Sequence, residues 1–378
     1  MVMTRILMGT AALCIFLAFL SCSEPSAEES EESTLLPETP EVDVWLSVSD
    51  SIGVEMGDSN LVFGKPAVPL ILENGNIAVL DIAKFRVSIF DHKGEFLDSF
   101  GRQGSGPGEF QMPAYLSATP SGGFVISDAM ARRLLFFDSS MNYTGYMGNF
   151  FPAPPLKAVF LTDSIFIGEI TAYETTDDEM LAGFEVARWR IGSFDEEAVY
   201  FKDLKPFSLQ SIGSSEASQP LFTASQDGLV YTSSLSTTVF RVDYWNPDGS
   251  RLLTIEESFT PVPRSQEEIN REREFTHDLF RRNGMPEEMI ENMQPEEYEY
   301  AITSLGIGPD ENLWVRTGIY DQPVFRIYDS STGQFIQTAA LRNTGDSAEM
   351  DILVTPNGLT GLRSMSDDWP RVYLLELR

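Results

Sequence analysis

Short apolar runs separated by turn residues recur along this chain at a fixed interval. The run ENGNIAVLD (73–81) is followed by RVSIFD (86–91), and PSGGFVISD (120–128) is followed by LLFFD (134–138). The matched pairs Gly75/Gly122, Asp81/Asp128 and Phe90/Phe137 are each 47 residues apart. A repeat of this length, made of strand-sized runs, predicts a modular all-β array, most directly a β-propeller.

Six copies of the same hairpin can be found if the loops vary in length. Some runs, such as 124–126 and 134–137, are apolar at successive positions, so both of their faces need cover. Propeller blades give that cover, and we therefore expect six blades of four strands each. The second strands are expected at 76–80, 123–127, 164–168, 228–232, 312–317 and 358–362, and the third strands at 86–90, 134–137, 185–191, 239–242, 324–328 and 372–375.

The last copy lacks a fourth strand of its own. Leu375 corresponds to Phe90, and only three residues follow it. Residues 42–48, which precede the first copy, alternate apolar and polar side chains with a period of two. We expect this N-terminal strand to complete the last blade, because that pairing closes the ring and removes an exposed edge.

One segment between the fourth and fifth copies has a helical pattern. Ser265 and Glu268 form a capping box, and an amphipathic run continues to Arg282. Pro286 begins a second, shorter helix. We expect a helical hairpin at 264–297, which is either a specificity element on one face of the ring or a filler packed on one blade.

The N-terminal segment predicts export. Residues 1–21 have the form of a signal peptide, with Arg5 before an apolar run at 6–20 that is short for a membrane span. The ending AFLSCS (18–23) resembles a bacterial lipoprotein cleavage site, which implies lipidation of Cys22; ordinary cleavage nearby and an uncleaved anchor are the alternatives. Residues 22–41, rich in Glu, Ser and Pro, predict an acidic flexible tether before a propeller at 42–378. The expected location is a bacterial cell envelope, lipid-anchored at the outer membrane or the cell surface.

Charge and cysteine content exclude other classes of protein. The formal net charge of −31 disfavours nucleic-acid binding. The only cysteines are Cys14 and Cys22, so cleavage at Cys22 leaves one thiol. One thiol forms neither an internal disulfide nor a thiolate zinc cluster.

A glycine-rich loop carries a family resemblance. The segment RQGSGPGEF (102–110) lies between the strand-like run FLDSFG (96–101) and the next unit at Pro113. With Val/Leu-Asp and Phe-Asp at the strand ends, it resembles NHL-repeat proteins, in particular bacterial six-bladed propellers that often carry lipoprotein signals. The likeness covers residues 58–150. The glycines and Pro107 suit a turn, and we expect Phe110 to fill the space between two blades.

The resemblance also implies an enzymatic alternative. Some NHL-type propellers are lyases, and other six-bladed propellers are metal-dependent lactonases with His or carboxylate groups in the central channel. Asp81 and Asp128 end equivalent strands and are the candidate ligands for calcium, which prefers oxygen. The competing interpretation, which their repetition favours, is that each carboxylate caps its own turn. His92 and His277 have no motif partner, so no catalytic residue is identified.

Two aromatic residues near loops complete the candidates. Trp245 and Trp369 are candidate binding residues for a sugar or a peptide, and core packing is the alternative for each. The sequence thus favours a non-enzymatic binding or scaffolding propeller, without a cofactor, that presents one face to a peptide, glycan or protein partner. The alternative is a calcium-dependent envelope lyase or lactonase with its site in the channel.

Overall fold

The computed structural model describes residues 40–176, 179–207, 218–282, 284–291, 293–320, 322–342, 350–363 and 369–378. The expected signal peptide, Cys22 and residues 22–39 of the expected tether lie outside these residues. Within them, no helix is both long enough and apolar enough to cross a membrane.

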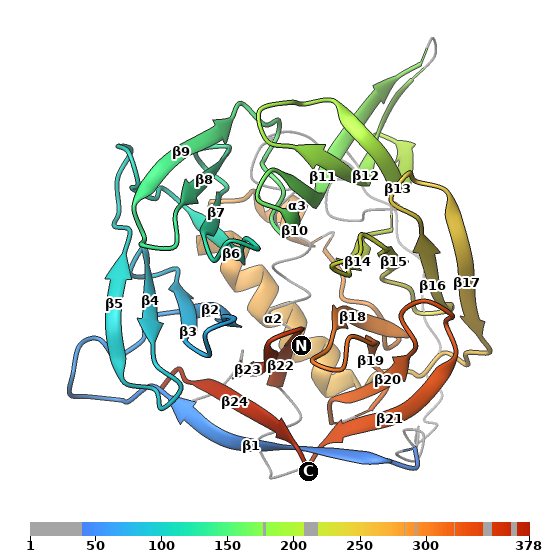
Figure 1. Cartoon of the computed structure of the whole chain (residues 1–378). Coiled ribbons are helices and arrows are strands. Elements are labelled where there is room, and N and C mark those ends of the chain that lie inside the picture. Colours follow the sequence, from blue (N-terminus) through green and yellow to red (C-terminus); the bar gives the residue numbers. More distant parts are fainter. Residues whose placement is uncertain are drawn as a thin grey trace.

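The chain forms six four-stranded units around a centre, so the expected six-bladed β-propeller is confirmed (Figure 1). Each unit is an antiparallel meander that begins with its inner strand, and the outer strand of blade 6 is the N-terminal strand β1. The strands are β2 (Pro66–Ile71), β3 (Ile77–Asp81), β4 (Arg86–Phe90) and β5 (Phe96–Phe100) in blade 1; β6 (Pro113–Ala118), β7 (Phe124–Asp128), β8 (Arg133–Phe137) and β9 (Tyr143–Gly148) in blade 2; β10 (Ala158–Thr162), β11 (Ile165–Thr175), β12 (Met180–Arg190) and β13 (Glu196–Pro206) in blade 3; β14 (Pro220–Ala224), β15 (Val230–Ser234), β16 (Phe240–Trp245) and β17 (Arg251–Glu257) in blade 4; β18 (Ile302–Ile307), β19 (Leu313–Thr317), β20 (Val324–Tyr328) and β21 (Phe335–Leu341) in blade 5; β22 (Met350–Thr355), β23 (Gly358–Arg363), β24 (Val372–Leu377) and β1 (Val44–Ile52) in blade 6.

The N-terminal strand closes the ring as expected, and it also pairs with a second blade. Strand β1 pairs antiparallel with β24, with Leu46 opposite Leu377 and Ile52 opposite Val372. Its first part also pairs in parallel with β21, where Leu46 lies opposite Leu341. Blades 5 and 6 therefore share one eight-stranded sheet, while the other four blades are separate four-stranded sheets. The second pairing was not expected, because the hydrophobic pattern of a strand does not specify how many neighbours it has.

Blade 3 departs from the repeat. Strands β11 and β12 are 11 residues each, and they project beyond the ring as a long hairpin (Figure 1). The repeat in the sequence predicts only 164–168 and 185–191 for these two strands. Lys202 on β13 forms ion pairs with both strands of this hairpin. Its Nζ lies 2.6 Å from a Glu174 oxygen and 3.0 Å from a Glu185 oxygen. By contrast, the third strands of blades 1 and 5 have the expected bounds.

The repeated strand order gives the ring two distinct faces. All inner strands run in the same direction, and in Figure 1 they lie nearest the centre. We call the face at which they begin the entry face; the residues just before β2, β6, β10, β14 and β18 lie there. Second strands end at the entry face, and third strands begin there. We call the opposite face, with the turns between third and fourth strands, the far face.

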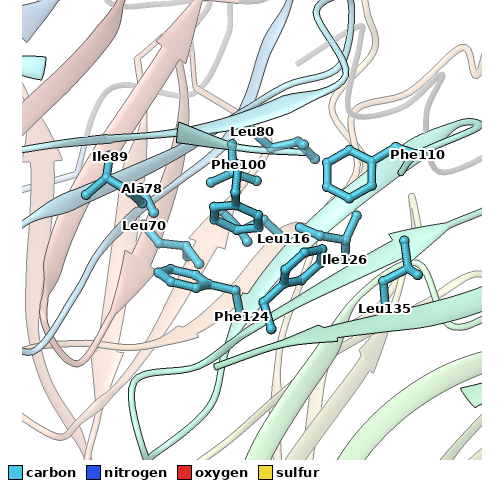
Figure 2. Packing of buried hydrophobic residues seen from close by; sticks show 12 residues of the cluster. Leu70, Ala78, Leu80, Ile89, Phe100, Phe110, Leu116, Phe124, Ile126 and Leu135 are labelled. Carbon is cyan, nitrogen blue, oxygen red and sulfur yellow. The ribbon is translucent and has the colours of Figure 1, made fainter. Parts of the chain in front are cut away.

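The core lies between neighbouring blades. Figure 2 shows one such cluster, in which Leu80 and Phe100 of blade 1 meet Leu116 and Phe124 of blade 2. Phe110, from the glycine-rich loop, is fully buried in the same cluster, as the sequence led us to expect. The apolar runs are therefore covered on both faces because each blade is enclosed by its neighbours.

The expected helical hairpin is present between blades 4 and 5 as α2 (Gln266–Arg282) and α3 (Glu287–Glu291). The backbone N–H of Ser265 donates to a Glu268 carboxylate oxygen, and the N–H of Glu268 donates to Ser265 Oγ, which completes the predicted capping box. Phe280 of α2 packs with Ile290 and Met293 in a small cluster of the hairpin's own. In Figure 1, α2 crosses the centre of the ring behind the strands.

Candidate binding face

Asp81 ties a linker to the end of a blade strand. Its carboxylate is fully buried and accepts hydrogen bonds from the backbone N–H groups of Gly64 (2.8 Å), Lys65 (2.9 Å) and Lys84 (3.2 Å). Gly64 and Lys65 precede β2, so this carboxylate joins the start of the inner strand to the end of the second strand. These are the bonds that the turn-capping interpretation requires.

Asp128 has the same role one blade later. It is fully buried and accepts from the backbone N–H groups of Gln111 (3.0 Å) and Met112 (2.7 Å), while Arg133 Nη2 lies 3.4 Å away. Within the described part of the chain, no three His, Cys, Asp or Glu side chains gather as a metal-ligand cluster. Calcium binding by Asp81 and Asp128 remains an untested prediction of the sequence.

Chelation provides a direct test of that prediction. Because the oxygens of Asp81 and Asp128 already accept backbone N–H groups, we expect EDTA to leave the melting temperature unchanged to within about 1 °C. A metal bound only by the folded state would stabilise it, so its removal would lower the melting temperature by several degrees. The measurement is a thermal unfolding scan with EDTA, repeated with added calcium. A clear fall that calcium reverses would favour the metal-dependent alternative.

The two candidate tryptophans lie on opposite faces of the ring. Trp245 is the last residue of the third strand β16, so it lies at the far face, whereas Trp369 precedes the third strand β24 and lies at the entry face. Trp245 is half-buried, and its Nε1 donates to Thr232 Oγ1 at 2.8 Å. The Arg371 guanidinium stacks 4.5 Å from the Trp369 ring centroid. The two residues therefore cannot form one shared platform.

The two histidines lie far from each other in the fold. His277 is on α2, with Nε2 3.2 Å from the Met293 carbonyl oxygen, so it takes part in holding the hairpin together. His92 is exposed in the turn between β4 and β5 at the far face. This separation gives the two imidazoles no common site.

A polar pair that the sequence did not single out lies where the two inner strands of blade 3 meet the entry face. In the register of blade 3, Ala158 pairs with Gly168, so Lys157 and Glu169 are the next neighbours toward the entry face. Glu169 thus occupies the strand-end position that Asp81 and Asp128 hold in the first two blades, where Pro66 and Pro113 face them. Aligning IFIGE (165–169) with IAVLD (77–81) would have found it, but the long strands of blade 3 obscured the repeat.

This pair is electrostatically unusual. Burial lowers the pKa of the Lys157 amine to about 8, an effect that the Glu169 charge partly opposes. Burial likewise raises the pKa of the Glu169 carboxyl to about 8, and Lys157 partly opposes that shift. By exposed area, both side chains are half-buried. Perturbed groups of this kind are enriched at functional sites.

The base of the helical hairpin is a buried ionic cluster. Arg264 Nη2 lies 2.6 Å from a Glu272 oxygen, and Arg264 Nε lies 3.6 Å from a Glu299 oxygen. The backbone N–H of Arg264 donates to the carbonyl of Glu297, which holds the two ends of the insertion side by side. Arg264 is only 7% exposed. Removing either carboxylate would therefore leave its buried positive charge with less negative charge beside it, which would destabilise the fold.

Comparisons with known proteins agree with the fold. A family model described as a 6-bladed beta-propeller matches residues 58–149. A Bacteroides fragilis protein described as exported is 13% identical, with a TM-score of 0.52, over 88% of this chain and 95% of that chain. A member of the duf4221 family from Bacteroides vulgatus is 9% identical (TM-score 0.48), over 89% of this chain and 98% of that chain. A gluconolactonase from Xanthomonas campestris is 10% identical (TM-score 0.45), over 88% of this chain and 98% of that chain.

No curated protein sequence matches the chain. At 13% identity, the likeness to the Bacteroides fragilis protein concerns the fold alone. Strand topology and the family model together define the class of protein as a six-bladed β-propeller.

Proposed function

We propose that this protein is an envelope-anchored binding or scaffolding propeller whose entry face, with the α2–α3 hairpin, recognises a peptide, glycan or protein partner. The observation that carries the proposal is the placement of the hairpin. It has its own small apolar cluster, and among the described residues no strand packs against α2 as closely as α3 does. An insertion that only filled a gap on a blade would bury its apolar stripe against that blade.

The position of β1 supports an anchored arrangement. The N–H of Asp43 donates to the Thr338 carbonyl at 3.0 Å, so the chain enters the propeller at its rim, beside β21. The proposed anchor would therefore connect to the ring at its outer edge. The export signal, lipidation of Cys22, the NHL-type relationship and the cell-envelope location are parts of this proposal and rest on the sequence patterns.

Removal of the hairpin tests the proposed function. We expect deletion of residues 266–296, with a short Gly-Ser link, to abolish partner binding while the melting temperature changes by only a few degrees. The ends of the deletion are already adjacent, because Arg264 bonds to Glu297 and Pro263 bridges to Tyr298. Binding is measured with immobilised protein against peptide and glycan arrays and against cross-linked envelope extracts.

The matched control lies on the other side of the ring. Lys93 is exposed in a far-face turn, and Lys93→Glu is expected to retain all binding. If the deletion variant stays folded and binds as the full chain does, the hairpin is not a recognition element. If Lys93→Glu loses binding instead, the partner site lies on the far face.

A further inference from the structure

The Lys157–Glu169 pair points toward the next blade. Directly opposed residues of neighbouring antiparallel strands present their side chains on the same face of the sheet. Lys157 Nζ donates to the carbonyl oxygen of Phe222 on β14 at 2.5 Å and lies 5.0 Å from the centroid of its ring. Both polar groups therefore face blade 4, at the entry-face end of the interface between blades 3 and 4.

The wall around the pair is mostly apolar. Phe222 belongs to the cluster between blades 3 and 4, with Ile167 and Val186 on the same face of blade 3 as Glu169. The strand β14 (PLFTA) brings no charged side chain. Asp203 on β13 also faces blade 4, but it lies closer to the entry face than Glu169 does. Its carboxylate accepts a hydrogen bond from the Ser218 N–H at 2.8 Å and forms an ion pair with Lys205 at 2.9 Å. Glu169 is thus the carboxyl group nearest to Lys157 in the strand register.

We propose that Lys157 is a carbonyl-reactive lysine that binds small aldehydes or ketones as imines at the entry-face end of the interface between blades 3 and 4. A lysine in an apolar, enclosed setting beside a carboxyl group has the arrangement that amine nucleophiles require, because desolvation favours the neutral amine. The apolar wall suits the carbon skeleton of such a ligand. This inference is independent of the proposed function, since it concerns the interface between blades 3 and 4 and not the hairpin.

Lys157 and Glu169 together account for every proton transfer in imine formation. The Nζ lone pair attacks the carbonyl carbon and forms a C–N bond, while the electron pair of the C=O double bond moves to oxygen. Glu169 gives its proton to that oxygen, and its carboxylate then takes the proton that Nζ loses, which leaves a carbinolamine. A second transfer along the same route expels the hydroxyl as water and leaves an imine. The high pKa of Glu169 keeps the required proton available near neutral pH.

Reductive trapping tests this inference. The purified full chain is incubated with glyceraldehyde and cyanoborohydride, and peptide mass mapping gives the labelling rate of each lysine. We expect Lys157 to label at least tenfold faster at pH 7.5 than Lys93, which is exposed in a turn and serves as the internal control. The Lys157 rate should rise with pH to a maximum near pH 8 and fall above it, because the amine becomes neutral over the range in which Glu169 loses the proton that it must donate.

Two variants test whether fast labelling of Lys157 comes from its reactivity or only from its accessibility. Glu169→Gln keeps the shape but lacks the proton donor, so Lys157 labelling should fall at least fivefold while thermal unfolding still shows a folded protein. Lys157→Arg should remove the fast label altogether and leave the Lys93 rate unchanged. Equal rates at Lys157 and Lys93, or unchanged labelling in the folded Glu169→Gln variant, would overturn the proposal.

Discussion

Leu46→Asp should open the ring. Leu46 is fully buried in the cluster shared by blades 5 and 6, and it lies in register with both Leu341 and Leu377. An unpaired carboxylate at this position would lose the apolar packing and bury a charge, so we expect the free energy of unfolding to fall by at least about 4 kcal/mol. The measurements are urea unfolding by circular dichroism and limited proteolysis, in which the N-terminal segment should become cleavable.

The same strand offers its own control. Val48 lies two residues further along β1 and is 40% exposed, so Val48→Asp should change the free energy of unfolding by less than about 1 kcal/mol. Because both substitutions place an aspartate in β1, the comparison separates the effect of burial from the low β propensity of aspartate. Similar urea midpoints for the two variants would mean that β1 does not hold the ring closed.

Phe110→Ala is expected to have the second largest effect. The ring is fully buried between blades 1 and 2, where it makes an edge contact with Phe137 at 6.1 Å between centroids. Truncation of a core phenylalanine leaves a cavity and costs about 3–5 kcal/mol. Thermal and urea unfolding give the value, and the transition should also broaden if blades 1 and 2 separate from the rest.

Phe151 provides the matched control for this substitution, since it is 58% exposed in the linker before β10. Phe151→Ala should cost less than about 1 kcal/mol. A second test uses Gly101, where an added Cβ would lie 2.2 Å from Phe110 Cε2 and φ is +87°. Gly101→Ala should therefore also destabilise the protein. If Phe110→Ala were as stable as the unsubstituted protein, the interpretation that Phe110 stabilises the contact between blades 1 and 2 would be wrong.

The candidate site was predicted less well than the fold. The sequence placed Asp81 and Asp128 at equivalent strand ends. In the structure each carboxylate accepts from the two backbone N–H groups just before the inner strand of its blade, because a repeated turn needs a similar cap each time. It could not pair Lys157 with Glu169, since blade 3 has longer strands than the repeat predicts. It also treated Trp245 and Trp369 alike, although strand direction places them on opposite faces.

What the sequence by itself determined is the local and periodic part of this protein: six hairpin units, the N-terminal strand that completes the last blade, and a capped helical insertion. These follow from hydrophobic period and turn chemistry, which act over a few residues. Only the tertiary structure decided that β1 also pairs with β21, that α2 lies across the centre of the ring, and that Lys157 and Glu169 are neighbours facing blade 4. Those features depend on contacts between distant segments, and no short-range pattern encodes which segments the closed ring brings together.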